Sequence, residues 1–299
     1  MRGPAVALAI VLAWGSLRAQ SQLDVSVNAR DTRPGDVVVV TTRTDTPADD
    51  VTVHLFDHRI PVFRTDTLTW TAVAGIDLDV PAGTYTAVVH ALGPQGAQQA
   101  SAALTIEPGR FPTRRLRVDP AFVDPPPDAV SRILSEADRL ERLWAGTGTR
   151  LWAGPFVAPV TGRPVGRFGA RSVFNGQPRA PHAGEDYAHA TGTPVVAPGG
   201  GLVALAESLY FTGTTIVIDH GAGLFSLVAH LSAMNVAVGD RVTTGQRIGA
   251  VGATGRVTGP HLHWSVRLGG ARVNPSSLLA ALGATTAAPA RATARRLPR

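Results

Sequence analysis

The stretch Thr258-Gly-Pro-His-Leu-His-Trp264 decides the fold of the C-terminal half, because it leads from a glycine turn into a β run that extends to Val266. In a strand, side chains two residues apart point to the same face. His261 and His263 therefore face one common site. Short β runs separated by glycine turns recur from Leu151 onward, which indicates a β domain around this histidine pair.

Two further segments carry groups of the same chemical kind. His182-Ala-Gly-Glu-Asp186 holds a histidine and a carboxylate four residues apart, on a chain that Gly184 can bend so that both side chains turn toward one point. His230 ends another β run, in Leu227-Val-Ala-His-Leu231. Any one of these histidines could be an ordinary core residue. Four that cluster in this way predict a functional site.

Length and composition limit the class of protein. The chain has 299 residues, which suggests two domains of ordinary size. It contains 32 glycines and 23 prolines, and only 17% of its residues are charged. This composition is typical of short strands and tight turns. It argues against a helical bundle, a coiled coil and a mainly disordered protein.

The charges are distributed unevenly along the chain. All 28 basic residues are arginine, and six of them lie in the two ends, where there are no acidic residues. Residues 20–110 carry 6 arginines and 11 acidic residues, a net charge of −5, whereas residues 111–283 carry 16 and 11, a net charge of +5. Because the body of the chain is neutral, we expect no nucleic-acid binding despite the isoelectric point of about 11.0.

The N-terminus has the pattern of a secretory signal. Residues 1–19 begin with Arg2, continue through an apolar run from Ala5 to Trp14, and end at Ala19, where cleavage is expected. The apolar run is shorter than the ~20 residues of a membrane span, and an uncleaved anchor is the alternative. We expect a secreted or periplasmic protein of the cell envelope, without stable membrane insertion after cleavage.

Residues 20–109 are predicted to form an immunoglobulin-like β-sandwich. Apolar and polar residues alternate there, as in Val51/Val53/Leu55, and turn clusters such as Arg33-Pro-Gly-Asp36 separate the runs. Three histidines in this region lack ligand-like spacing and are interpreted as surface residues. They are His54, His58 and His90.

Residues 110–150 are predicted to be a linker with one amphipathic helix. Asp128 is a candidate N-cap after three prolines, and apolar residues recur at 3.6-residue spacing as far as Ala145, before Gly146 ends the helix. We expect the apolar stripe to pack on a neighbouring domain rather than to be free for binding a partner protein. Residues 151–282 then form the second β domain, and residues 283–299 a disordered basic tail.

The chemistry of these side chains points to zinc. The chain has no cysteine, so metal ligands must be histidine, aspartate or glutamate. Catalytic zinc commonly has three protein ligands and an open position for water, whose pKa falls to about 7. Without a helical His-Glu-x-x-His arrangement, proton transfer would fall to the remaining histidines, whose ordinary pKa is about 6.5. The pattern is that of a hydrolase in outline.

From about Val160 to Pro275, the chain resembles the lysostaphin-type zinc endopeptidases, also called LytM-like or glycyl-glycine endopeptidases, which cut peptide bonds in bacterial peptidoglycan. The matching segments include Phe168-Gly169, Asn175-Gly176, His182-Ala-Gly-Glu-Asp186, Thr193-Pro-Val-Val-Ala197, Val217-Ile-Asp-His-Gly221, Ala229-His-Leu-Ser232, Val238-Gly-Asp240, Gly245-Gln246 and Thr258-Gly-Pro-His-Leu-His-Trp264. The resemblance implies a mainly β protein whose C-terminal LytM-like peptidase domain has an antiparallel β core, with the site in a groove between loops.

The resemblance also implies a role for each residue of the site. One zinc ion per chain would be held by His182, Asp186 and His263. His230 and His261 would assist the water and stabilise the transition state. Peptidoglycan would be the partner.

Two positions depart from the family pattern. Val228 stands where an aromatic residue is frequent, two positions before His230. Glu185 stands where an apolar residue is usual; turned toward the metal it would weaken the electrophile, and turned toward solvent it would be neutral. His189 and His220 match no ligand or catalytic position and are interpreted as structural or surface residues, with His220 the better candidate for a hydrogen bond behind a ligand.

Two functions compete at this point. One is a zinc metalloendopeptidase acting on stem or cross-bridge peptides; the other is a catalytically silent regulator that binds peptidoglycan or activates another hydrolase. All five metal and catalytic positions are filled, which favours the enzyme. A third reading, an N-terminal adhesin or carbohydrate module, has only strand periodicity behind it. The bond cut and the oligomeric state are left undecided.

The opposite net charges of the two halves suggest a further hypothesis. The N-terminal domain would dock on the second domain through the helix of residues 128–145 and limit access to the site. An independent spacer or wall-binding module is the alternative.

Overall fold

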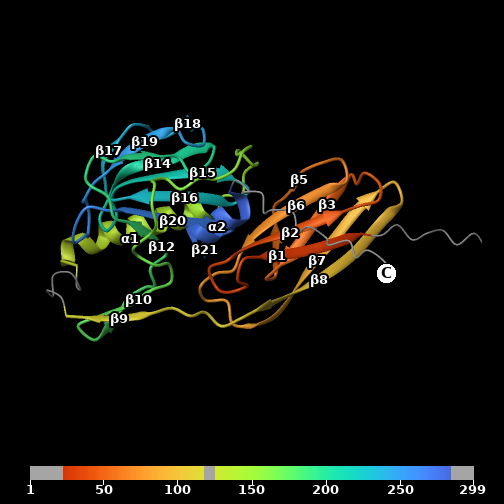
Figure 1. Ribbon diagram of the computed structural model, residues 1–299, viewed down its shortest axis with the longest axis horizontal. Coiled ribbons are helices and arrows are strands. Elements are labelled where there is room, and N and C mark those ends of the chain that lie inside the picture. The colour runs from red at the N-terminus through yellow and green to blue at the C-terminus, as the bar shows by residue number, and fades with distance from the viewer. Residues whose placement is uncertain (1–22, 118–124, 284–299) are drawn as a thin grey trace, which may run out of the picture.

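Residues 23–117 and 125–283 are described by a computed structural model. The expected signal segment, residues 1–19, and the expected tail after Gly283 lie outside these ranges. Within them the protein is mainly β, as predicted, with two helices. Figure 1 shows two β regions joined along one boundary, the N-terminal region in red to orange and the C-terminal region in green to blue. None of the helices in the described ranges has the length and apolar character needed to cross a bilayer.

The N-terminal region consists of two four-stranded sheets. In sheet order they are β1 (Asp24–Ala29), β2 (Val37–Arg43), β6 (Thr69–Gly75) and β5 (Val62–Arg64), and β4 (His58–Ile60), β3 (Asp50–Leu55), β7 (Gly83–Gly93) and β8 (Gly96–Ile106). The period-two alternation buries one face of each sheet in a shared core, which includes Val40 and Val53. The three histidines of this region are exposed, as expected. The immunoglobulin-like topology stays a prediction.

The C-terminal region is built on a seven-stranded antiparallel sheet. Its order is β12 (Gly184–Tyr187), β20 (Leu262–Leu268), β16 (Leu224–Ala229), β15 (Gly213–Gly221), β14 (Gly201–Leu209) and β18 (Arg241–Val242), with β21 (Ala271–Val273) also paired to β20. A three-stranded sheet of β13 (Pro194–Val196), β19 (Arg247–Val251) and β17 (Leu231–Met234) shares its core. Every residue of β16 is buried, because both faces of this strand are covered.

Helix α1 (Pro127–Trp144) covers one face of that strand. Trp144 packs with Phe225 and Leu227, and the side chain of Glu136 accepts a hydrogen bond from the backbone N–H of Tyr210. Trp144 is the one buried residue of α1, Leu140 and Leu143 are partly covered, and Val130 and Leu134 remain 40% and 64% exposed. Asp128 lies inside the first turn rather than at the N-cap, which is Pro126 without a side-chain hydrogen bond.

The linker also contains a strand that its sequence did not reveal. β9 (Thr113–Leu116) pairs in parallel with β10 (Arg171–Phe174), which in turn pairs with β11 (Gln177–Pro178). Figure 1 shows this small sheet extending from the lower edge of the C-terminal region. The linker thus becomes part of the structure that precedes His182.

The two regions meet at β21 and at helix α2 (Pro275–Leu282), which the sequence analysis also missed. The backbone N–H of Val37 donates to Oγ of Ser277 at 2.9 Å. Arg272 forms a two-pronged ion pair with Asp77, at 2.5 and 3.0 Å. The contact thus runs mainly through β21 and α2. α1 reaches it only with its C-terminal end, which lines an interdomain cavity of about 550 Å³.

Candidate metal centre

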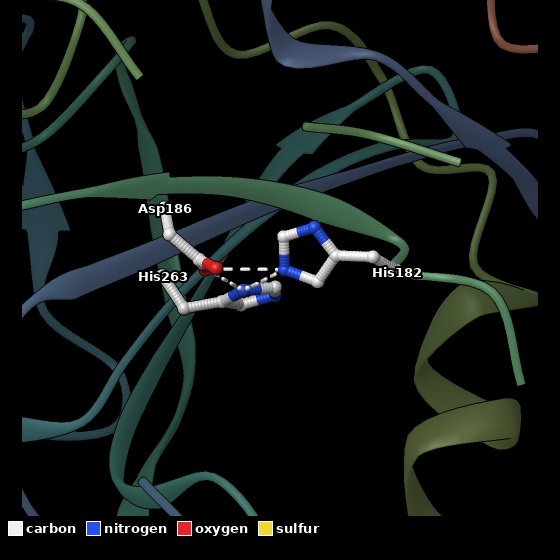
Figure 2. Close-up of side chains that lie close together, drawn as sticks. All are labelled: His182, Asp186 and His263. Atoms are coloured by element: carbon white, nitrogen blue, oxygen red, sulfur yellow. Dashed lines mark hydrogen bonds and ion pairs between the residues drawn. The ribbon is translucent and has the colours of Figure 1, made fainter. Parts of the chain in front are cut away.

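Three side chains from two strands and one loop converge on one point. The Nε2 atom of His182 lies 3.1 Å from Oδ1 of Asp186 and 3.1 Å from Nδ1 of His263. Oδ1 of Asp186 and Nδ1 of His263 are 2.9 Å apart. Figure 2 shows the three groups pointing at one another. We call these residues the metal triad.

Strand pairing places two members of the metal triad. Asp186 on β12 lies directly opposite His263 on β20 in the antiparallel register, so both side chains leave the same face. Glycines make room for them. A Cβ atom on Gly184 would lie 2.8 Å from Nε2 of His263, and a Cβ atom on Gly166 would overlap the carboxylate of Asp186. No side chain larger than hydrogen fits at either position without displacing the triad.

The third member, His182, is oriented by the preceding loop. Its Nδ1–H donates to the carbonyl oxygen of Arg167 at 3.0 Å, which leaves the lone pair of Nε2 for the triad. Its backbone is tied down by hydrogen bonds to Gly169 and Ala170. The ring of Phe168 is buried, and the ring of Phe111 lies against Gly169, so the linker supports the loop.

Two further imidazoles flank the metal triad. The rings of His230 and His261 lie 4.8 Å apart, and the ring of His230 lies 6.0 Å from that of His263. Nδ1–H of His230 donates to the carbonyl oxygen of Thr254, and Nδ1–H of His261 donates to that of Gly259, each at 2.9 Å. Because a carbonyl can only accept, both rings keep an unprotonated Nε2 when neutral.

His230 adopts an uncommon backbone conformation. Its φ of 63° lies in the left-handed region, which is rare outside glycine and is often found at functional sites. The turn lies between β16 and β17, and the backbone N–H of His230 donates to the carbonyl oxygen of Thr212. This bend turns the ring of His230 away from the buried side chains of β16 and toward His261.

Electrostatics keep the carboxylate ionised and His230 neutral. Burial opposes ionisation of Asp186, but the close contacts of its carboxylate with the rings of His182 and His263 outweigh it and hold the pKa of Asp186 well below its usual range. Burial, together with the neighbouring ring of His263, lowers the pKa of His230 to about 4. At neutral pH, His230 is therefore a proton acceptor.

The donor set fits a zinc ion. The three atoms of the metal triad all lie within 4.8 Å of one another and comprise two imidazole nitrogens and one carboxylate oxygen. Ligands at about 2.0–2.1 Å from a tetrahedral zinc are roughly 3.3 Å apart, which is close to the separations in the triad. The charge of Asp186 and the neutral histidine ligands suit a divalent cation.

The remaining positions singled out in the sequence lie elsewhere. Glu185 is 4% exposed and faces away from the metal triad, accepting hydrogen bonds from Tyr187 and from Ser276 of α2. It therefore points neither to the metal nor to solvent, which were the two orientations considered. Val228 belongs to the core.

The two unassigned histidines have structural hydrogen bonds. His220 is fully buried and bonds to the carbonyl oxygen of Gly200 and to Oγ of Ser226, not to a ligand of the triad. His189 bonds to the carbonyl oxygen of Thr161. Sequence reasoning missed the carbonyls of Arg167, Thr254 and Gly259, since every residue carries a carbonyl and only the fold reveals which one orients a ring.

Comparison with known proteins shows which family the region around this site resembles. Residues 180–275 match peptidase family M23. The peptidoglycan DD-endopeptidase ShyA of Vibrio cholerae is 45% identical over 95 residues, which is 32% of this chain and 22% of that protein. The DD-carboxypeptidase/endopeptidase Mpg of Neisseria meningitidis is 45% identical over 97 residues, again 32% of this chain and 22% of the relative. The match thus spans about a fifth of the length of these curated relatives.

A solved structure extends the likeness beyond the matched region. A crystal structure from Pseudomonas aeruginosa assigned to peptidase M23 aligns with 84% of this chain and 96% of its own, with a TM-score of 0.63 and 28% sequence identity. The alignment includes part of the N-terminal region as well as the C-terminal sheet. The resemblance to the LytM-like peptidases is thereby confirmed, with residues 180–275 of this chain matching peptidase family M23.

Proposed function

We propose that the protein is a zinc endopeptidase that hydrolyses peptide bonds in the stem or cross-bridge peptides of peptidoglycan. One observation carries the proposal: the metal triad and the two flanking imidazoles, which are far apart in sequence, meet at one point. A regulator that only binds the wall would need neither the ligand set nor the two additional histidines. The catalytically silent alternative is therefore an outcome of the test below rather than a second proposal.

The residues divide into two roles. His182, Asp186 and His263 would hold the ion. Zinc bound there would acidify a water molecule and polarise the scissile carbonyl. His230 and His261 have Nδ1 committed to backbone carbonyls, so each exchanges a proton at Nε2. The Nε2 atom of His261 lies 3.9 Å from Oδ1 of Asp186, which places it beside the reacting atoms. It can accept a proton from the attacking water and return it to the departing amine.

The name of one relative, the peptidoglycan DD-endopeptidase ShyA, supports peptidoglycan as the substrate and therefore the cell envelope as the location. We therefore extend the proposal to a secreted or periplasmic protein, with residues 151–282 as the metallopeptidase unit. The interdomain contact has two parts: Gly75 approaches Ala271 and Val273 at the far end of β20 from His263, and Gly35 approaches the ring of Phe168, in the loop that orients His182. The inhibitory hypothesis therefore stays a prediction beside the spacer alternative.

Digestion of defined muropeptides tests the proposal. The purified, zinc-loaded protein is incubated with directly cross-linked dimers and with glycine-bridged dimers, and products are identified by mass spectrometry. A new amine and a new carboxylate at one peptide bond are expected. The His261→Ala variant, loaded with zinc to the same content, is the matched control. Binding without cleavage by the wild-type protein would establish the regulator instead.

A further inference from the structure

Gly35, in the turn between β1 and β2, touches the C-terminal region at two points. Its carbonyl oxygen accepts a hydrogen bond at 2.7 Å from the backbone N–H of Asn274, the residue that caps helix α2. It also lies against Phe168, because a Cβ atom added to Gly35 would overlap the ring of that residue. Its φ of 97° lies in the left-handed region, which favours glycine. Both the backbone and the close contact therefore require glycine here.

Helix α2 lies at the boundary between the two regions (Figure 1) and is tied to the N-terminal region by two hydrogen bonds. One is the bond from Asn274 to Gly35. The other is the bond from the backbone N–H of Val37 to Oγ of Ser277 at 2.9 Å. Val37 also shares a buried core with Leu278, the most enclosed residue of the helix. The position of α2 is therefore set by the N-terminal region as well as by its own sheet.

Glu185 connects α2 to the metal triad. Its Oε1 accepts a hydrogen bond from the hydroxyl of Ser276 at 2.7 Å, and its Oε2 accepts one from the hydroxyl of Tyr187 at 3.1 Å. Glu185 immediately precedes Asp186 on β12. Within the described residues, this short strand pairs along its length only with β20, and its other edge has a single bridge between Gly166 and Asp186. The position of Asp186 therefore depends on the anchor behind it.

The second contact of Gly35 leads to His182. Phe168 is buried between two residues that bind this ligand. On one side, the carbonyl oxygen of Arg167 accepts the Nδ1–H of His182 at 3.0 Å. On the other, the backbone N–H of Gly169 donates to the carbonyl oxygen of His182 at 2.8 Å. A shift of the Phe168 ring would disturb both hydrogen bonds, and Gly35 limits that shift.

We propose that the turn containing Gly35 positions the metal triad, so that the interdomain contact raises the affinity of the site for zinc. One path runs through α2 and Glu185 to Asp186, and the other runs through Phe168 to His182. Ligands that are already held in place lose less conformational freedom when the metal binds, which strengthens binding. Glu185 and Phe168 are positioning residues, since they act through the ligands. The inference rests on the proposed function only in taking zinc as the metal.

Two glycine variants of the full-length protein test the proposal. Gly35→Ala adds a Cβ atom that collides with Phe168. Gly96→Ala is the matched control, because Gly96 lies in the same region with a φ of 95° and has no atom within 4 Å of an added Cβ. The zinc Kd is measured by competition with a chelator, at a temperature where circular dichroism shows both variants folded.

Gly35→Ala should raise the zinc Kd at least about threefold, and Gly96→Ala should leave it unchanged. The expected effect is smaller than the 10–100-fold of a residue that bonds directly to a ligand, because the turn acts through intermediate residues. An unchanged zinc Kd in Gly35→Ala would overturn the proposal. A lower Kd would overturn it too, since the N-terminal region would then hinder the site.

A double-mutant cycle tests the path through Glu185 and does not depend on the folding of Gly35→Ala. Ser276→Ala removes the hydroxyl and should raise the zinc Kd about threefold in the wild-type background. In the Glu185→Leu background, which has no acceptor, it should have no effect. Glu185→Gln keeps an oxygen that can accept from Ser276 and should bind zinc nearly as tightly as the wild type. Equal effects of Ser276→Ala in both backgrounds would assign the serine to helix packing and overturn this path.

The outcomes separate this inference from the proposed function, because none of the measurements uses turnover. A zinc Kd that is the same in all variants, with muropeptide cleavage by the wild type, would overturn the inference and leave the endopeptidase intact. A zinc Kd that depends on the interdomain contact, without cleavage by the wild type, would have the opposite meaning. Absence of zinc binding by the wild-type protein would overturn both.

Discussion

Asp186 and His263 lie directly opposite each other in the antiparallel pair of β12 and β20, with Oδ1 and Nδ1 2.9 Å apart. Each therefore depends on the other for its position. Replacing His263 by Ala should lower zinc affinity more than about 100-fold, since even a residue that only hydrogen-bonds to a metal ligand contributes about 10–100-fold to metal affinity. Elemental analysis of purified protein measures the loss. The control is His189→Ala, which removes a loop histidine outside the triad. Full zinc occupancy in His263→Ala would contradict the ligand assignment.

The flanking histidines should separate metal binding from chemistry. His230→Ala and His261→Ala should each retain zinc and lose about 10²–10⁴-fold in turnover, the range for a general acid or base. Both values are measured on the same preparation, zinc by elemental analysis and turnover with a cross-linked dimer. Wild-type turnover in either zinc-loaded variant would reassign that histidine to a structural role.

The support that the linker gives to His182 should appear in metal affinity. Phe111 lies against Gly169, whose backbone N–H bonds to the carbonyl of His182. Phe111→Ala should weaken zinc binding by about tenfold, because the ligand is then less well held. Phe56→Ala removes an aromatic contact with Tyr85 in the N-terminal region and should leave zinc affinity unchanged. If Phe111→Ala binds zinc like the wild type, the loop is rigid without the linker.

Buried His220 should make the folded state sensitive to acid. Burial holds the pKa of His220 at about 4, below the value of about 6.5 in an unfolded chain. Between these values the unfolded chain binds more protons, so the stability that neutral His220 contributes is present above pH 6.5 and is lost as the pH falls toward 4.

Thermal midpoints between pH 7.5 and 4 measure this effect. The zinc-free protein is used so that metal release does not contribute. His220→Gln should be less stable at neutral pH but show a flatter pH dependence than the wild type. His54→Gln, at an exposed position, should follow the wild-type curve. Parallel curves for the wild type and His220→Gln would show that another group carries the acid sensitivity.

The ion pair between Arg272 and Asp77 should stabilise the interdomain contact. The hydrogen bonds from Arg272 outweigh burial and lower the pKa of Asp77 to about 2. Arg272→Ala should cost about 1–3 kcal/mol in the free energy of unfolding, because a partly buried charge loses its partner. Arg142→Ala breaks an exposed pair with Asp138 and should cost less than about 1 kcal/mol.

The pH dependence of stability provides a second test of the ion pair between Arg272 and Asp77. The contribution of Asp77 is present above pH 4 and is lost as the pH falls toward 2, where the carboxyl is protonated. The difference between Arg272→Ala and the wild type in urea unfolding should shrink over this interval. A difference that does not depend on pH would assign the effect to packing of the arginine side chain.

The local pattern predicted some elements of this site and could not predict others. Residues two apart in a strand share a face, so the convergence of His261 and His263 follows from their spacing. The approach of Asp186 to His263 depends on which strands pair, and that information is not local. Glu185 shows the same limit. Alternation places its side chain on the other face of β12 from that of Asp186, but only the packing of α2 shows that this face is buried.

Two elements escaped the sequence analysis for identifiable reasons. β9 is four residues long and contains two arginines, so it has no apolar alternation. It is a strand because β10 pairs with it. α2 has eight residues, too few for a clear helical period, although Asn274 caps it as a helix N-terminus would require. In both cases the tertiary partner, rather than intrinsic propensity, decides the conformation.

The hydrogen bond between Val37 and Ser277 joins residues 240 positions apart in the chain. Contacts of such separation form slowly, because the entropy of closing the intervening loop is lost before the contact is gained. During synthesis, the N-terminal sheets emerge long before α2 exists, and the apolar face that includes Val37 and Val73 is exposed to solvent until then. A chain shortened before residue 275 would keep that apolar face exposed permanently, and self-association would then compete with folding.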